Sequence, residues 1–261
     1  MSASLFVQMA ALNEREGIGD VIRTVPRDIP GIGRVTVLVV DDGSTDGTSD
    51  IARQSGADMI VRHDITLGLG VAFQRGLVEC LARGADIIVH TDADGQFLSS
   101  QIPNLIQPIL TKRADIAIGR RPMGSLRHYT PVMRLTHLLG AGAMAAICGQ
   151  RVHDPVCGFR AFSAHAAAHI QVTHAFSHTI ETLAQVRPLG LHVDNVPVSA
   201  CVVSRPSRLL RHGGLNFVVR QAAILLDMLV QPGWSLPVRP GLHALVQGRQ
   251  PIRHPVTVLR E

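Results

Sequence analysis

The residues best suited to chemistry stand in the segment HTDADGQ at positions 90–96, where one residue separates two carboxylates. Asp92 and Asp94 offer the hard oxygen ligands that divalent cations such as Mg²⁺ prefer, and Gln96 can add a neutral oxygen. A cation bound there could neutralise the charge that develops on a departing diphosphate. A turn rich in Asp and Gly without any ligand explains this motif equally well when it is taken alone. The motif is not a complete EF-hand, because the final Glu is missing.

A second segment, VVDDGSTDGT at 39–48, ends an apolar run with two acids and continues through Gly43 into the start of a helix. Asp42 could accept hydrogen bonds from a base or a ribose, and the N-terminus of the following helix favours an anion nearby. An ordinary capped turn between a strand and a helix is the simpler interpretation of this motif alone.

Both motifs follow apolar runs that alternate with helical patterns over the first 120 residues. Continuous apolar runs at 35–40, 85–90 and 114–119 indicate strands that are buried on both faces of a mainly parallel sheet. Residues 69–83 repeat large apolar side chains at helical spacing. In open α/β sheets the ligand binds at the carboxyl ends of the strands. The polar residues expected to converge at that edge are Asn13, Glu14, Asp41, Asp42, Asp92 and Asp94.

The remainder of the chain is less regular. We expect helices at 132–148, 163–171 and 178–188 and a strand at 191–199, which completes one domain over residues 1–230. Residues 231–261 are basic, contain Pro and Gly, and show few periodic apolar positions. They are predicted to form a C-terminal tail with little regular structure.

Composition narrows the classes of function. The 25 Lys and Arg residues exceed the 20 Asp and Glu residues, and the net charge of +5 suits nucleic acid, anionic membranes or phosphorylated substrates. Aromatic residues make up only 3% of the chain, which argues against single-stranded nucleic acid, and no nucleic-acid partner is expected. Four widely spaced cysteines without a CxxC pair favour a reducing cytoplasm.

Two apolar segments fall short of a membrane span. Residues 135–148 are interrupted by His137, and residues 215–230 are interrupted by Arg220 and Asp227. Both are predicted to be helices that either pack against the protein or lie on a membrane surface. The N-terminus lacks the basic start and the cleavage site of a signal peptide, so a cytoplasmic protein is expected, with peripheral contact at the cytoplasmic face of the membrane.

Together with ALNE at 11–14, LGLG at 67–70 and CGFRAFS at 157–163, the two acidic motifs resemble the inverting GT-A glycosyltransferases of family two. The resemblance is greatest to dolichyl- or polyprenyl-phosphate mannose synthase-like members, and it spans roughly residues 5–212 in order and spacing. It implies a Rossmann-like GT-A fold with a mainly parallel central sheet flanked by helices. It also implies metal-dependent transfer of a hexose, mannose or glucose, from a nucleotide diphosphate sugar to a polyprenyl or dolichyl phosphate, with Mg²⁺ or Mn²⁺ as the cofactor.

The resemblance also assigns roles to single residues. The nucleotide would contact Asn13, Glu14, Asp42, Gly43 and Asp92, and the metal would be held by Asp92, Asp94 and Gln96. The catalytic set would be Asp92, Asp94, Arg121 and Asp154. The phosphates of donor or acceptor would face Arg121, Arg134, Arg160, Arg205 and Arg208, and Glu181 would order the site without touching a ligand. A buried turn in which Arg160 pairs with Asp154, and a solvated basic surface at Arg205 and Arg208, are the structural alternatives.

Departures from the family pattern leave the donor base and the acceptor open. Ala10 and Leu12 replace the usual Pro and Tyr, the usual Asn before GLG is absent, and residues 119–121 read GRR where the family has GSR.

Three functions remain in competition. A lipid phosphate is already ionised and can attack without a general base, so the protein would supply positioning and charge stabilisation. A hydroxyl acceptor would need a base, and Asp154 is the candidate. A non-catalytic nucleotide-sugar binding protein is the third alternative, against which the intact motif at Asp92, Asp94 and Gln96 argues.

Overall fold

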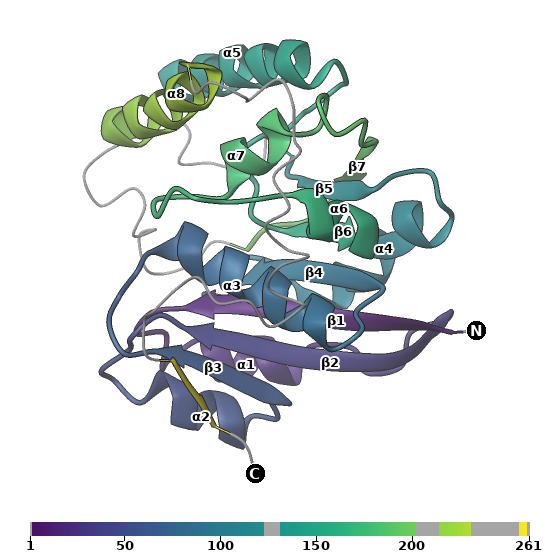
Figure 1. Cartoon of the computed structure of the whole chain (residues 1–261), viewed down its shortest axis with the longest axis vertical. Helices are drawn as coiled ribbons and strands as arrows, with labels where there is room; N and C mark the ends of the chain where they lie inside the picture. The colour runs from purple at the N-terminus through teal and green to yellow at the C-terminus, as the bar shows by residue number, and fades with distance from the viewer. Residues whose placement is uncertain (1, 123–130, 202–213, 231–255, 260–261) are drawn as a thin grey trace.

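The computed structural model describes residues 2–122, 131–201, 214–230 and 256–259, and its centre is one eight-stranded sheet in the order β7-β5-β6-β4-β1-β2-β3-β8. Helices flank this sheet, with α3 in front of it and α1 behind it in Figure 1. The α/β class and the mainly parallel sheet are therefore as the sequence predicts.

The strands on the N-terminal side form a parallel set. β1 (Ala3–Ala11) pairs with β2 (Ile32–Asp41) and with β4 (Ile87–Asp92), and β2 pairs with β3 (Met59–His63). Because these strands run in one direction, Ala11, Asp41 and Asp92 end at the same edge of the sheet, where Ala10 is the register partner of Asp92. The topology thus brings the two acidic motifs together.

The rest of the sheet is mixed. β6 (Arg160–Ser163) lies antiparallel between β4 and β5 (Ile116–Arg120), and β7 (Val193–Pro197) continues the sheet parallel to β5. β8 (Val256–Leu259) pairs antiparallel with β3 at the opposite edge. Of the predicted tail, the structure describes only these four residues, whose sequence of β-branched residues suits an edge strand.

The longer helices occupy the segments that the apolar periodicity predicts, and the brief helices are shorter than predicted. The helices and the 3-10 turn η1 are α1 (Ile18–Arg23), α2 (Thr48–Gln54), α3 (Leu69–Ala82), η1 (Ser99–Gln101), α4 (Ile102–Leu110), α5 (Pro131–Cys148), α6 (Ala164–His169), α7 (Thr179–Ala184) and α8 (Gly214–Val230). α7 ends before the predicted residue 188, because Pro188 lacks an N–H and cannot continue a helix.

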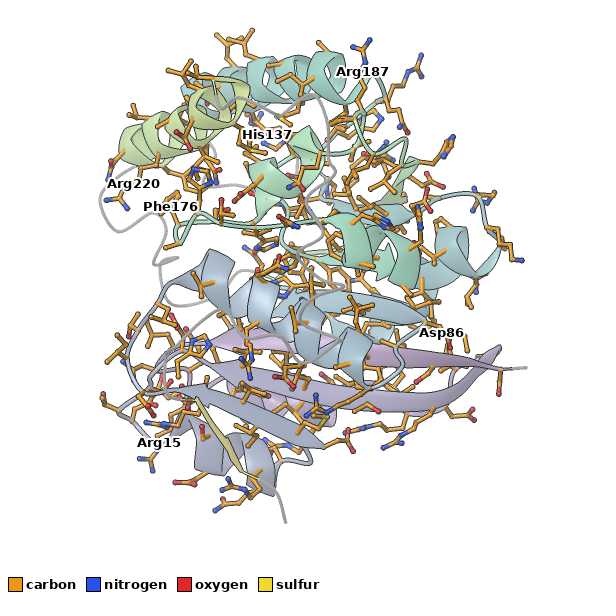
Figure 2. The ribbon with its side chains drawn as sticks, in the orientation of Figure 1. Arg15, Asp86, His137, Phe176, Arg187 and Arg220 are labelled. Carbon is orange, nitrogen blue, oxygen red and sulfur yellow. The ribbon has the colours of Figure 1, made fainter. Side chains whose placement is uncertain are left out.

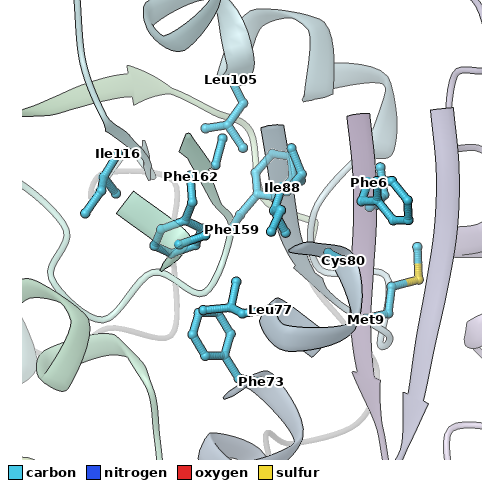
Figure 3. Packing of buried hydrophobic residues seen from close by; sticks show 14 of the residues in the cluster. Phe6, Met9, Phe73, Leu77, Cys80, Ile88, Leu105, Ile116, Phe159 and Phe162 are labelled. Carbon is cyan, nitrogen blue, oxygen red and sulfur yellow. The ribbon is translucent and has the colours of Figure 1, made fainter. Parts of the chain in front are cut away.

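The core packs against both faces of the sheet. Phe73 and Leu77 of α3 point toward Phe159 and Phe162, and Leu105 and Ile116 lie beyond them (Figure 3). The consecutive residues Ile87, Ile88 and Val89 of β4 are all buried, which explains why this strand reads as an uninterrupted apolar run. The acidic edge therefore stands on a rigid, fully packed strand.

α5 and α8 occupy the same end of the long axis of the molecule (Figure 1). Neither these two nor any other helix of the described ranges has both the length and the apolar character needed to traverse a bilayer. All four cysteines are free thiols, of which only Cys201 is exposed.

Candidate active site

The acidic edge is built from the end of β4 and the turn that follows it. Asp92 is the last residue of β4, and Asp94 accepts a 2.9 Å hydrogen bond from the backbone N–H of Gln96, which fixes the turn. Burial and the neighbouring charges of Asp94 and Glu14 raise the pKa of Asp92 to about 7, although Arg121 opposes this shift. The negative charges are thus crowded at a point where a cation would relieve their repulsion.

A glycine allows another segment to approach this edge closely. A Cβ atom at Gly158 would lie 3.0 Å from Oδ2 of Asp92, so the absence of a side chain lets the CGF segment approach the carboxylate closely. The resemblance to a known family included this segment, and the structure gives the physical reason for its glycine.

The donor set suits a cation that is shared with a substrate. The described residues contain no group of three or more His, Cys, Asp and Glu side chains arranged to hold a metal. Asp92, Asp94 and Gln96 provide two carboxylates and an amide, which is too few for a closed structural site. Mg²⁺ is usually bound by one or two carboxylates together with water and substrate phosphates, and this set fits that pattern.

Hydrogen bonds join the segment 11–14 to the segment 41–48. Asn13, at a φ of 49°, donates its N–H to Oγ of Ser44 at 2.8 Å, and its Oδ1 accepts from the N–H of Thr45 at 2.8 Å. The N–H of Glu14 donates to Oγ1 of Thr48 at 2.9 Å. The two predicted nucleotide segments are therefore one rigid unit at the edge of the sheet.

Asp42 holds the loop at 63–68. Its carboxylate is buried and accepts hydrogen bonds from the N–H groups of Leu67 at 2.9 Å and Gly68 at 2.8 Å, while Nδ1 of His63 lies at 2.8 Å. Gly43, at a φ of +83°, leaves room for the same loop, because a Cβ there would lie 2.9 Å from the backbone of residues 65 and 66. Asp42 thus shapes the border of the predicted nucleotide site.

Arg121 and Asp154 form a forked ion pair. Nε and Nη2 of Arg121 donate to the two oxygens of Asp154 at 2.7 and 2.9 Å, and both side chains are buried. A carboxylate engaged in this way is poorly placed to take a proton from a hydroxyl group. The role of Asp154 as a general base stays a prediction, and in this structure the carboxylate holds the guanidinium of Arg121 in place.

Arg121 lines a cavity of about 490 Å³. Its wall includes His137 and Leu138 of α5 and also His153. Nothing in the sequence around these two histidines indicates that they belong to the site. The fold alone brings them beside Arg121, and Nε2 of His137 lies 3.8 Å from Oδ1 of Asp154.

Arg160 does not face a substrate. It is completely buried, and its guanidinium donates to the carbonyl oxygens of Cys157, Thr179 and Pro155 at 2.8, 2.8 and 2.7 Å. The predicted phosphate contact is wrong, because these donors are directed at carbonyls inside the protein. The alternative pairing with Asp154 is also wrong, since Arg121 takes that place.

The remaining predicted residues are placed as follows. Arg134 is exposed in α5, and Arg205 and Arg208 lie outside the described residues. Glu181 is buried in α7, where it accepts hydrogen bonds from Thr173 and from the N–H of His174. It therefore orders a loop and does not contact the acidic edge in any interaction that the structure records.

Comparisons with known proteins agree with this architecture. Residues 6–170 match the model of glycosyl transferase family 2. The chain is 31% identical over 173 residues to an undecaprenyl-phosphate mannosyltransferase of Micrococcus luteus, with 62% of this chain and 70% of that protein covered. It is 28% identical over 194 residues to a dolichyl-phosphate hexose transferase of Haloferax volcanii, with 74% and 81% covered.

Among solved structures, the fold is similar to glucosyl-3-phosphoglycerate synthase from Mycobacterium tuberculosis, crystallised with Mn²⁺, UDP and glucosyl-3-phosphoglycerate. The TM-score is 0.66 at 25% identity, with 86% of this chain and 79% of that chain covered. The fold is thus that of the GT-A glycosyltransferases. From its family match, its sheet and its acidic edge, the chain belongs to glycosyl transferase family 2.

Proposed function

We propose that this enzyme transfers a hexose, mannose or glucose, from a nucleotide diphosphate sugar to a polyprenyl phosphate, with inversion at the anomeric carbon and with Mg²⁺ or Mn²⁺. The observation that carries the proposal is the wall of the Arg121 cavity. Leu138 lines this cavity and is also 64% exposed on α5. A phosphate can thus lie beside a guanidinium while the attached apolar chain leaves along an apolar helix.

The apolar surface extends well beyond Leu138. The other exposed large apolar residues of the two helices at this end are Leu135, Leu139, Val218, Val219, Leu226 and Val230. Exposed arginines accompany them, Arg134 on α5 and Arg220 on α8, and Figure 2 labels Arg220. Apolar side chains with basic neighbours suit the surface of an anionic bilayer. We therefore propose peripheral contact with the membrane that carries the acceptor.

Different residues of the chain then contribute to different parts of the reaction. Asp92 and Asp94, with Gln96, would bind the cation, which neutralises charge on the departing nucleoside diphosphate. Arg121, held by Asp154, orients the acceptor phosphate. One phosphate oxygen forms a bond to the anomeric carbon while the bond from that carbon to the donor diphosphate breaks. Because the phosphate is already ionised, no residue has to remove a proton.

The names of the relatives support this proposal for the acceptor and for the transferred sugar. The two curated relatives are named for transfer to undecaprenyl or dolichyl phosphate. The solved neighbour was crystallised with Mn²⁺ and UDP, which supports the use of a divalent cation together with a nucleotide.

A second candidate is transfer to a small phosphorylated acceptor through its hydroxyl group. The same neighbour was also crystallised with UDP-glucose and phosphoglyceric acid, and a basic cavity could bind such a compound. This candidate requires a general base, and Asp154 is occupied by Arg121. We therefore favour the lipid phosphate.

The test is a donor screen with the purified full chain, Mn²⁺ and vesicles that contain polyprenyl phosphate. Mannose and glucose activated by GDP or UDP are supplied in turn, and both nucleoside diphosphate release and label in the lipid are measured. We expect lipid labelling with one donor and none when polyprenol replaces its phosphate. Labelling of phosphoglyceric acid instead would favour the second candidate, and no turnover with any donor would favour a binding protein.

Variants sharpen the screen. Arg121→Gln should lower transfer to the lipid by at least about 100-fold, since a misplaced or missing phosphate contact has effects of that order. Arg113→Gln, which removes an exposed ion pair with Asp194, should leave transfer unchanged. Equal activity of the two variants would contradict the role of the cavity.

A further inference from the structure

The loop between α6 and α7, residues 170–178, lies against the beginning of α3; we call it the tie loop. The N–H of Gly70 donates to the carbonyl oxygen of Ala175 at 3.0 Å, and the N–H of Val172 donates to Oε1 of Gln74 at 2.8 Å. A Cβ atom at Gly70 would lie 1.9 Å from the carbonyl oxygen of His174. Only glycine there permits this close backbone contact.

The tie loop thereby contacts the loop that Asp42 holds. Asp42 binds the N–H of Gly68, and a Cβ at Gly68 would lie 2.5 Å from the carbonyl oxygen of Ala175. The border of the proposed nucleotide site and the tie loop therefore share a backbone contact. Movement of one displaces the other, because the packing leaves no free space between them.

The opposite side of the tie loop contacts α8. Nε2 of His174 lies 3.0 Å from Oδ2 of Asp227, and the rings of Phe176 and Phe217 are 5.9 Å apart. The guanidinium of Arg220 stands 5.0 Å from the centre of the Phe176 ring, and Figure 2 shows these two side chains together below α8. Three contacts thus join the tie loop to the helix that we place on the bilayer.

Glu181 makes this connection stiff. One of its buried oxygens accepts from the N–H and Oγ1 of Thr173 at 2.9 and 2.8 Å, and the other accepts from the N–H of His174 at 3.1 Å. The ring of His174 therefore lies between a buried carboxylate on α7 and the exposed carboxylate of Asp227 on α8. An anchored backbone transmits a displacement of α8 and does not absorb it.

We propose that His174 is a positioning residue that connects α8 to the nucleotide border, so that binding of α8 to a lipid surface strengthens the binding of the nucleotide. The inference rests on the proposed membrane-bound acceptor. Because coupling between two binding events is reciprocal, the nucleotide also strengthens the attachment to lipid. The enzyme then binds its donor best where its acceptor is found.

The experiment measures the dissociation constants of GDP and of UDP, each with Mn²⁺, for the full chain with and without vesicles of phosphatidylcholine and phosphatidylglycerol. We expect the wild type to bind one of the two nucleotides, and to bind it at least about fivefold more tightly with vesicles than without them, which is the lower end of typical coupling. His174→Ala should reduce this ratio to less than about twofold, which corresponds to less than 0.5 kcal/mol of coupling, while binding without vesicles stays near the wild-type value.

Matched variants separate positioning from a loss of folding. Asp227 is 54% exposed, so its replacement leaves the core intact. Asp227→Asn keeps an oxygen that can accept from Nε2 of His174 and should preserve the coupling, whereas Asp227→Ala should lose it. Asp50→Ala, which removes an exposed ion pair with Arg53 on α2, should retain full coupling.

The outcomes distinguish this inference from the proposed function. A protein that does not float with vesicles contradicts the membrane-bound acceptor and the inference with it. A protein that floats but binds nucleotide equally with and without vesicles overturns the inference alone. Full coupling in both His174→Ala and Asp227→Ala overturns it as well.

Discussion

Breaking the ion pair between Arg121 and Asp154 should be costly in either single variant and much less so in the double variant. Asp154 is 1% exposed and Arg121 is 8% exposed, and two hydrogen bonds of 2.7 and 2.9 Å join them. Removing one partner of a buried pair costs about 3–5 kcal/mol, because the other charge stays buried. We expect about 3 kcal/mol for Asp154→Asn, since asparagine keeps one acceptor oxygen. Arg121→Met should cost a similar amount.

The double variant Arg121→Met, Asp154→Leu removes both charges of this pair and should regain most of that stability. Urea unfolding of the wild type, Arg121→Met, Asp154→Leu and the double variant, followed by circular dichroism, gives the four free energies of unfolding of the cycle. We expect a coupling of at least about 2 kcal/mol between the two positions.

The transfer activities of these variants should not follow the order of their stabilities. Asp154→Asn should lower transfer by about 10- to 100-fold through misplacement of Arg121, and the double variant should be inactive despite its recovered stability. Free energies that add within about 0.5 kcal/mol would refute the buried pair. If Asp154→Asn keeps full stability and loses transfer only to hydroxyl acceptors, the result would instead support Asp154 as a general base.

Three further predictions use other parts of the fold. Gly70→Ala should destabilise the protein by about 1–3 kcal/mol, because the added Cβ pushes the tie loop away. Gly140→Ala in α5 should stabilise it by about 0.5–1 kcal/mol, because a Cβ there would meet nothing within 4 Å. Urea unfolding measures both changes. Burial lowers the pKa of His90 to about 3 and that of His178 well below its ordinary value of 6.5. Below pH 6.5 the unfolded chain therefore binds protons that the folded protein does not bind, and the free energy of unfolding should fall by about 1.4 kcal/mol per histidine and pH unit. Thermal melts between pH 7 and pH 5 measure this loss, and a constant melting temperature over that range would contradict it. A thiol reagent should modify only Cys201 in the native protein, because the other three thiols are buried and burial raises their pKa; mass spectrometry that finds a second modified cysteine would contradict this packing.

The parts of the site that could be predicted are those encoded by short segments. Asp92 and Asp94 follow an uninterrupted apolar run, and the rule that parallel strands end at one edge brings them to Asn13 and Glu14 without any knowledge of side chains. The GLG segment at 68–70 likewise indicates the beginning of α3, which starts at Leu69. These features depend on neighbours within a few residues.

The parts that could not be predicted depend on partners far apart in the chain. Arg121 meets Asp154, 33 residues away, while Arg160, only six residues after Asp154, turns to backbone carbonyls. Asp42 is saturated by N–H groups 25 and 26 residues later. No local pattern states which arginine reaches which carboxylate, because that choice is made by packing of the whole sheet. The position of the short antiparallel strand β6 between β4 and β5 is likewise not predictable from a local pattern.

The most direct test of the central claim is the binding of Mn²⁺ and nucleotide at the acidic edge. Titration of the full chain with GDP and UDP by calorimetry, with and without Mn²⁺, should show binding of one nucleotide that depends on the cation. Asp94→Asn should weaken that binding by at least about tenfold, because changing even a partner of a metal ligand typically costs about 10- to 100-fold and Asp94 is proposed as a ligand itself. Nucleotide that binds Asp94→Asn as tightly as the wild type, in the same cation-dependent manner, would contradict the account.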